Sequence, residues 1–327
     1  MNTPAAAAAS SRPSMTADVA ALGYRLAGVL LLSAALAFLS DAFLTTPNLL
    51  NVLRQASLNF LIASGVTLVI LTAGLDLSIG ANVGLSACLA AVAFKATGSI
   101  AAGVSAGLAC GTLIGILNAL MVTRLRLPPF IATYGMLWMV HGFTYWFMAG
   151  ETIYGFPPAF RALGSGYLLG IPVPVYLMAA CLAVGGVFTR HTTYGYEIYA
   201  IGANAEAARL SGIPVNTRLT LAYTLSGAMA GLAAVVYLAR LNSAEADIGE
   251  PLMLPAIAAV LIGGTSLFGG LGSLSGTLIG AVLLTLVLNG MNLLNISANW
   301  QPLVTGGIVL LAVWIDIMTR QRADAQA

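Results

Sequence analysis

A polar, charged loop stands between two apolar runs and holds side chains suited to binding another protein. The loop reads Y-A-I-G-A-N-A-E-A-A-R-L-S-G-I-P-V and runs from Tyr199 to Val215. Glu206 and Arg209 are three residues apart, so a helix would place both charges on one face, where they can pair with each other or with a partner. A solvated loop with a local ion pair is the alternative interpretation.

The residues around this pair predict a short helix. Asn204 is a favourable N-cap, and residues 205–210 are mostly strong helix formers. Gly212 and Pro214 follow, which is typical of the end of a helix. We therefore expect a helix of one to two turns here.

An aspartate in an apolar region is the second polar feature. Asp76 lies in the sequence D-L-S-I-G, within a Gly-rich break between two apolar runs. We interpret it as a cap whose carboxylate accepts a backbone N–H from Ser78 or Ile79 at the start of the next helix. The alternative is that the carboxylate lines a path for a solute whose hydroxyl groups it binds.

Other polar and aromatic side chains within the apolar runs could also line such a path. Trp138, His141 and Tyr145 follow an i, i+3, i+7 spacing, which places them on one helix face. Rings and an imidazole could stack on and bond to a polar solute, although satisfied contacts between helices are the more general role of such groups. The candidate path residues are Asp76, Ser78, Asn82, Asn118, Trp138, His141 and Tyr145.

The sequence lacks the patterns of common enzyme sites. Lys95 is the only lysine, and no glycine precedes it as in a phosphate-binding loop. His141 and His191 lie far apart, in neither a metal-binding nor a nucleophile-elbow pattern. We therefore expect no catalytic residue, no metal and no cofactor in this chain. The cysteines lie in apolar runs and are interpreted as packing residues: Cys88, Cys110 and Cys181.

Composition indicates the environment that surrounds these groups. The chain is 59% hydrophobic and 7% charged, and its mean hydropathy is +0.93. An average soluble domain has about 25% charged residues, so the composition predicts a polytopic membrane protein. The formal net charge of +2, without a long basic run, argues against nucleic acid as a partner.

Apolar windows of roughly 20 residues, the length that crosses a bilayer, predict an all-α fold with about ten transmembrane helices. The transmembrane domain is expected over residues 23–319, between a disordered cytoplasmic tail at 1–22 and a cytoplasmic tail at 320–327. Two windows are short and adjoin Gly-rich breaks, which indicates either helices broken near a translocation path or tight turns. The windows are 24–43, 57–74, 78–94, 100–123, 129–148, 172–189, 218–241, 252–266, 274–292 and 301–318, of which 78–94 and 252–266 are the short ones.

The positions of Lys and Arg predict the orientation of the spans. With both termini in the cytoplasm, nine of the 13 positive residues lie inside, and Arg54, Lys95, Arg161 and Arg240 lie outside. The loop that contains Glu206 is then cytoplasmic. The acidic residues on the outer side are then Glu151, Glu245, Asp247 and Glu250.

Glycines at helical spacing predict close packing between helices. They recur every four residues, so they share one helix face and allow another backbone to approach. The repeat is Gly103, Gly107, Gly111 and Gly115, with the pairs Gly227/Gly231 and Gly276/Gly280 elsewhere.

Three stretches carry a family resemblance. They are G-V-T-L-V-I-L-T-A-G-L-D-L-S-I-G from Gly65 to Gly80, G-A-N-A-E-A-A-R-L-S-G-I from Gly202 to Ile213, and L-I-G-G-T-S-L-F-G-G-L-G-S-L-S-G from Leu261 to Gly276. Together they resemble the permease subunits of bacterial ABC sugar importers, the group that includes the ribose, xylose and galactose permeases. The resemblance extends from about residue 25 to 318.

The resemblance implies an importer in the bacterial inner membrane that moves a monosaccharide inward. Two permease subunits, either two copies of this chain or this chain and a paralogue, would form the path. Two ATPase subunits would dock from the cytoplasm and bind ATP and Mg, and a periplasmic sugar-binding protein would deliver the sugar. The loop expected to lie in a cleft of the ATPase includes Gly202, Asn204, Glu206, Ala207, Arg209, Gly212 and Ile213.

Two other functions are open from the sequence: an ion-coupled secondary sugar transporter that works alone, and a membrane enzyme. Ion coupling usually requires charged groups within the spans, and only Asp76 is expected to lie deep. An enzyme would need a catalytic cluster, which the sequence does not show. We therefore prefer the importer.

Overall fold

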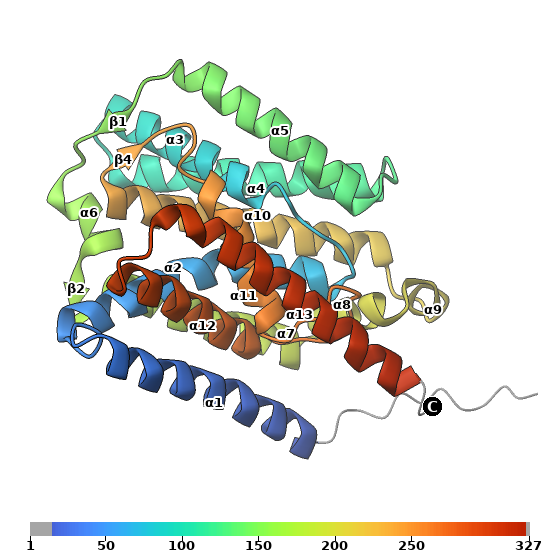
Figure 1. The fold of residues 1–327 in the computed structure, drawn as a ribbon. Helices are drawn as coiled ribbons and strands as arrows, with labels where there is room; N and C mark the ends of the chain where they lie inside the picture. Colours follow the sequence, from blue (N-terminus) through green and yellow to red (C-terminus); the bar gives the residue numbers. More distant parts are fainter. Residues whose placement is uncertain (1–14, 325–327) are drawn as a thin grey trace, which may run out of the picture.

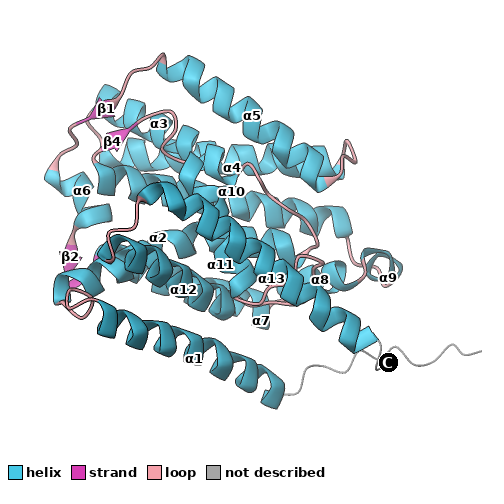
Figure 2. Ribbon diagram, in the orientation of Figure 1, coloured by secondary structure: helices cyan, strands magenta, loops and turns pink. Residues whose placement is uncertain are grey.

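A bundle of long helices makes up most of the molecule. The computed structural model describes residues 15–324. Figures 1 and 2 show these residues as a helical bundle with four short strands at its edges. The helices are α1 Met15–Leu39, α2 Thr46–Leu71, α3 Ile79–Thr97, α4 Ile100–Thr123, α5 Pro129–Met148, α6 Pro158–Ser165, α7 Val173–His191, α8 Thr193–Ala203, α9 Ala205–Leu210, α10 Val215–Leu241, α11 Met253–Ile262, α12 Leu274–Leu293 and α13 Gln301–Asp324. The strands are β1 Ile153–Tyr154, β2 Tyr167–Leu168, β3 Ile171–Pro172 and β4 Ser243–Ala244, and the 3-10 helices are η1 Glu250–Leu252 and η2 Ala298–Trp300.

Each of the ten expected windows overlaps one helix, and all of these helices except the ten-residue α11 are long. Among the described residues, seven helices are long and apolar enough to cross a membrane, three fewer than expected. Helices α1 and α11 contribute only shorter apolar segments, Gly23–Leu39 and Glu250–Ile262. Helix α5 has 20 residues but carries many Tyr, Trp, Thr and His side chains, which make it less apolar. The arrangement is that of a multi-pass membrane protein.

The helices at the two ends of the chain extend into the segments that were expected to be tails. Helix α1 begins at Met15, within the segment 1–22 that was expected to be a tail, and α13 ends at Asp324, within the segment 320–327. The Ala- and Leu-rich sequence after Met15 has high helix propensity, which explains the longer α1. Residues 1–14 and 325–327 lie outside the described residues.

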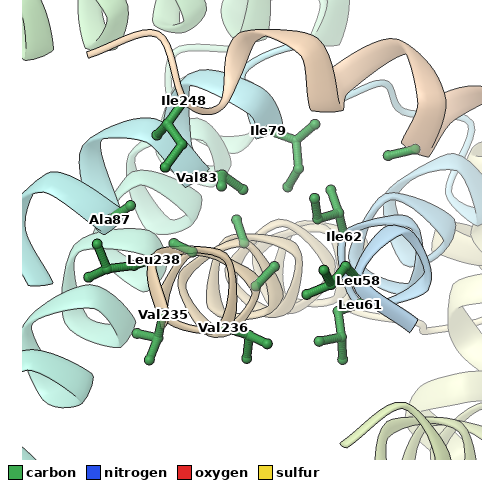
Figure 3. Packing of buried hydrophobic residues seen from close by; sticks show 14 of the residues in the cluster. Leu58, Leu61, Ile62, Ile79, Val83, Ala87, Val235, Val236, Leu238 and Ile248 are labelled. Carbon is green, nitrogen blue, oxygen red and sulfur yellow. The ribbon is translucent and has the colours of Figure 1, made fainter. Parts of the chain in front are cut away.

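Helix α2 forms the centre of the core. It is apolar on all sides and buried at nearly every position from Ala56 to Leu71, as expected for a helix surrounded by others. Leu61 and Ile62 belong to one buried cluster with Val83 of α3 and Val235 of α10 (Figure 3). The central α2 therefore packs against both α3 and α10.

The expected glycine contacts are present between α4 and α10. A Cβ added at Gly111 would lie 2.6 Å from the nitrogen and 2.7 Å from the Cα of Gly231. A Cβ at Gly227 would lie 2.7 Å from the Cα of Gly115. Because these neighbours are backbone atoms, only glycine allows the two helices to approach this closely.

The two ends of the bundle carry different structures. Figure 1 shows α9 at one end, together with the N-terminal end of α1 and the C-terminal end of α13. The other end carries α6 and two antiparallel ladders, in which β1 pairs with β4 and β2 pairs with β3. These ladders are the only departure from the expected all-helical fold within residues 15–324. They satisfy backbone groups of connections that are not helical.

Candidate coupling helix and translocation pocket

The loop around Glu206 forms the expected short helix, α9. The Asn204 side chain caps it, because Oδ1 accepts a hydrogen bond of 2.9 Å from the Ala207 backbone N–H. The helix ends at Leu210, and the Ile213 N–H donates back to the Ala208 carbonyl oxygen at 3.1 Å. Gly212 has a φ of +86°, which explains why glycine follows the last turn.

An ion pair lies on the outer face of α9. The Arg209 guanidinium donates to both carboxylate oxygens of Glu206, at 2.5 and 3.0 Å, and both side chains are 65% exposed. Hydrogen bonding from Arg209 lowers the pKa of Glu206, so the carboxylate stays charged at neutral pH and the pair is lost only as the pH falls through that lowered pKa. Leu210 is also exposed, at 77%, beside this pair. Helix α9 therefore presents a charged and apolar surface to solvent.

A second ion pair, which was not predicted from the sequence, fixes the arm that carries α9, namely α8, α9 and the start of α10 at residues 193–218. Glu197 of α8 pairs with Arg218 of α10, and both side chains are largely buried. The Arg218 guanidinium also lies over the Tyr194 ring, 4.3 Å from its centroid. The partners are 21 residues apart, so no local spacing in the sequence indicates this contact. It ties the two sides of the arm together.

The base of the arm lies against two other segments. Gly202 is buried, and a Cβ there would overlap the Leu71 carbonyl oxygen and the Gly270 nitrogen. The Gly270 N–H donates to the Leu71 carbonyl oxygen at 3.0 Å, and the Tyr199 hydroxyl donates to the Gly272 carbonyl oxygen at 2.9 Å. The three sequence stretches that carry the family resemblance therefore meet at this point.

Asp76 lies in the connection between α2 and α3 and is fully buried. Its Oδ1 accepts hydrogen bonds from the Ser78 backbone N–H at 3.0 Å and the Ser78 hydroxyl at 2.7 Å. The Ser226 hydroxyl of α10 donates to Oδ2 at 3.2 Å, and the Asn118 amide of α4 donates to the Ser78 hydroxyl at 2.7 Å. Helix α3 begins at Ile79, so Ser78 holds the N-cap position while Asp76 ties the connection to two other helices.

Asn82 also joins helices. Its amide donates to the Gly111 carbonyl oxygen of α4 at 3.1 Å, and its oxygen accepts from the Ser86 hydroxyl at 3.0 Å. Of the candidate path residues, Asp76, Ser78, Asn82 and Asn118 are thus buried in contacts between helices, and none lines the pocket described next.

A pocket of about 240 Å³ lies between α5, the first half of α3 and the region of η1 and α11. Trp138 and His141 line it, and Tyr145 lies next to His141 with ring centroids 4.7 Å apart. Aromatic rings form a row along α5. The ring centroids of Tyr134 and Trp138 are 6.3 Å apart, and those of Trp138 and His141 are 5.8 Å apart. The ring faces can pack on the apolar side of a small solute.

Three polar residues that line the pocket were not among the path residues predicted from the sequence. Tyr134, Thr144 and Glu250 line it together with glycine backbone at Gly80 and Gly249. The spacing of Tyr134 four residues before Trp138 was a signal for the same helix face. Glu250, one of the acidic residues expected on the outer side, lines the pocket together with residues of α3, because Gly249 and Met253 on either side of η1 pack against Gly80. Hydroxyl and carboxylate groups can bond to the hydroxyl groups of a solute.

Comparisons with known proteins identify the family of this chain. The sequence profile of the family described as "Branched-chain amino acid transport system / permease component" matches residues 48–313. The chain is 41% identical over 295 residues to the ribose import permease protein RbsC of Escherichia coli (strain K12), covering 89% of this chain and 92% of that protein.

Two further relatives give the same result. RbsC of Bacillus subtilis (strain 168) is 40% identical over 291 residues, covering 88% of this chain and 90% of that protein. The galactose/methyl galactoside import permease protein MglC of Escherichia coli (strain K12) is 34% identical over 313 residues, with coverages of 90% and 93%. No solved structure matches the chain significantly. The chain therefore belongs to this family of permease components, the membrane-spanning subunits of transport systems.

Proposed function

We propose that this chain is the transmembrane subunit of an ABC importer that moves a monosaccharide into the cell. The observation that carries the proposal is α9, a capped and exposed helix that stands at one end of a permease. A partner ATPase would bind α9, hydrolyse ATP and bind the required Mg. A binding protein would deliver the sugar at the opposite end of the bundle.

The proposed substrate is a pentose or hexose of the ribose type. Two relatives are named as ribose import permeases and one as a galactose/methyl galactoside import permease. A sugar presents both an apolar face and hydroxyl groups, and the pocket offers rings from α5 beside Glu250 and Thr144. The pocket volume of about 240 Å³ suits a small solute of this class.

The proposed location is the bacterial inner membrane, with α9 in the cytoplasm. The N-terminal end of α1 and the C-terminal end of α13 lie at the same end of the bundle as α9, which supports cytoplasmic termini. A single cysteine introduced at the exposed Ser211 should react with a membrane-impermeant maleimide only in inverted vesicles, whereas one at Glu151 should react in intact spheroplasts. Reaction of both from the same side would reject this topology.

The second permease position is proposed to be filled by a copy of this chain or by a paralogue, because an ABC importer requires two membrane subunits. A pull-down of the tagged chain from native membranes in mild detergent, followed by mass spectrometry and an ATPase assay, tests the proposal. We expect an ATPase to co-purify and its activity to rise with a sugar-loaded binding protein. A chain that elutes alone, without ATPase, would reject it.

A further inference from the structure

The connection between α2 and α3 touches both parts of the proposed transport machinery. At its start, the Leu71 carbonyl oxygen lies against Gly202 at the base of the arm that carries α9. Just beyond its end, Gly80 of α3 lines the pocket. The residues from Leu71 to Gly80 therefore join the ATPase-binding arm to the sugar pocket by a short covalent route.

The start of this connection is held tightly to the arm. A Cβ added at Gly269, which has a φ of +80°, would lie 2.6 Å from the Ala73 nitrogen and 2.9 Å from the Gly202 Cα. Together with the bond from the Gly270 N–H to the Leu71 carbonyl oxygen, these contacts leave no space between the arm and the connection. A displacement of the arm must therefore move Leu71 and Ala73.

The middle of the connection bonds directly to the pocket helix. The Thr133 hydroxyl of α5 lies 3.0 Å from the Leu75 carbonyl oxygen and 2.9 Å from the Pro129 carbonyl oxygen of its own helix. Thr133 is fully buried and precedes Tyr134, which lines the pocket. A hydroxyl has one hydrogen to donate, so it can exchange one acceptor for the other without losing its hydrogen bond.

The far side of the connection has a fixed point. Asp76, next to Leu75, is bonded to Ser78 and to Ser226 of α10, and Ser78 is bonded to Asn118 of α4. A movement imposed at Leu71 would therefore turn the segment about Asp76 and shift the Leu75 carbonyl relative to Thr133.

We propose that Thr133 is a positioning residue, whose hydroxyl transmits movement of the α9 arm through the Leu75 carbonyl to the pocket face of α5. The inference rests on the proposed importer function. It assigns the role to the hydroxyl, not to the volume of the side chain.

The test compares Thr133→Val, which keeps the side-chain shape, with Thr133→Ser, which keeps the hydroxyl. The full complex of permease, ATPase and binding protein is reconstituted in proteoliposomes, with ribose as the probe. We expect Thr133→Val to assemble and to keep its basal ATP hydrolysis. Ribose uptake per ATP hydrolysed should fall about fivefold, which corresponds to the net free energy of one hydrogen bond. Thr133→Ser should retain most of the coupling.

Thr123→Val is the matched control. Thr123 is also buried, but its hydroxyl bonds only to Ala119 in its own helix, at 2.7 Å, so this variant should couple as the wild type does. If Thr133→Val fails to insert, Thr133→Ala, which cannot overfill the site, carries the same expectation. Wild-type coupling in the hydroxyl-free variant, or equal loss in Thr133→Ser, would overturn the inference. Failure of the wild-type complex to hydrolyse ATP in response to sugar would instead count against the proposed function.

Discussion

At the scale of single residues, Glu206 and Arg209 form the exposed ion pair on α9, the helix proposed to bind the ATPase. Their pairing follows from a spacing of three residues within one helix, and the Asn204 cap follows from the residue type, so both could be predicted from the sequence. The contact between Thr133 and Leu75 could not, because its partners are 58 residues apart and meet only when α5 packs on the connection after α2. Local patterns hold no information about such pairs.

Replacing Arg209 with Glu should abolish sugar-stimulated ATP hydrolysis and leave the permease folded in the membrane. The change places two negative charges three residues apart on the exposed face of α9 and removes the cation offered to the partner. The exchange Glu206→Arg with Arg209→Glu is the control, because it restores a pair within the helix but reverses the charges seen by the ATPase. We expect this double variant to stay inactive. Normal sugar-stimulated ATP hydrolysis in Arg209→Glu would contradict the proposed binding of the ATPase to α9.

Replacing Asp76 with Asn should mainly reduce stability. The change replaces one of the buried carboxylate oxygens that accept hydrogen bonds from Ser78 and Ser226 with an amide nitrogen, which cannot accept them, at a cost of about 1–3 kcal/mol. Thermal unfolding of the detergent-purified protein measures this cost, and the exposed Asp41→Asn should leave the midpoint unchanged. Normal stability with a loss of uptake per folded molecule would mean that Asp76 lines the path instead.

At the scale of elements, the apolar windows predicted the positions of ten helices, nine long ones and the short α11, to within several residues at most ends. The correspondence arises because roughly 20 apolar residues both cross a bilayer and form a helix. The start of α2 at Thr46, 11 residues before the expected window, was missed because Asn48, Asn51 and Arg54 interrupt the apolar run. The pairing of β1 with β4 was also missed, since it joins Ile153 to Ala244, which lie 91 residues apart in the sequence.

The surroundings of two glycines predict opposite effects on stability when each glycine is replaced by alanine. Gly111→Ala should destabilise the protein by about 1–3 kcal/mol, because its Cβ would overlap α10 backbone that cannot move without separating the helices. Gly307→Ala on α13 should be neutral or stabilising by up to about 1 kcal/mol, because its Cβ meets nothing within 4 Å and alanine favours the helix. Thermal melts of the two purified variants decide this, and equal midpoints would contradict the close packing of α4 on α10.

At the scale of the whole molecule, an exposed helix stands at one end of the bundle and a pocket lies among α3, α5 and η1. The composition predicted a membrane protein, and the family resemblance predicted the permease, which the relatives confirm. The position of the pocket could not be predicted, because Glu250, Gly80 and Trp138 lie on elements that come together only in the folded bundle. The buried amides Asn82 and Asn118 show the same limit, since their sequence context does not distinguish a path from a helix contact.

Ribose uptake into proteoliposomes that contain the chain with its ATPase and binding protein tests whether the chain is an ABC importer subunit. ATP is supplied on the side that carries α9, and uptake is measured with the proton and sodium gradients intact and then collapsed. We predict that ribose accumulates in the vesicles only when ATP, the ATPase and the binding protein are present, and that this accumulation persists without ion gradients. Uptake by the chain alone, driven by a proton or sodium gradient and indifferent to ATP, would contradict it.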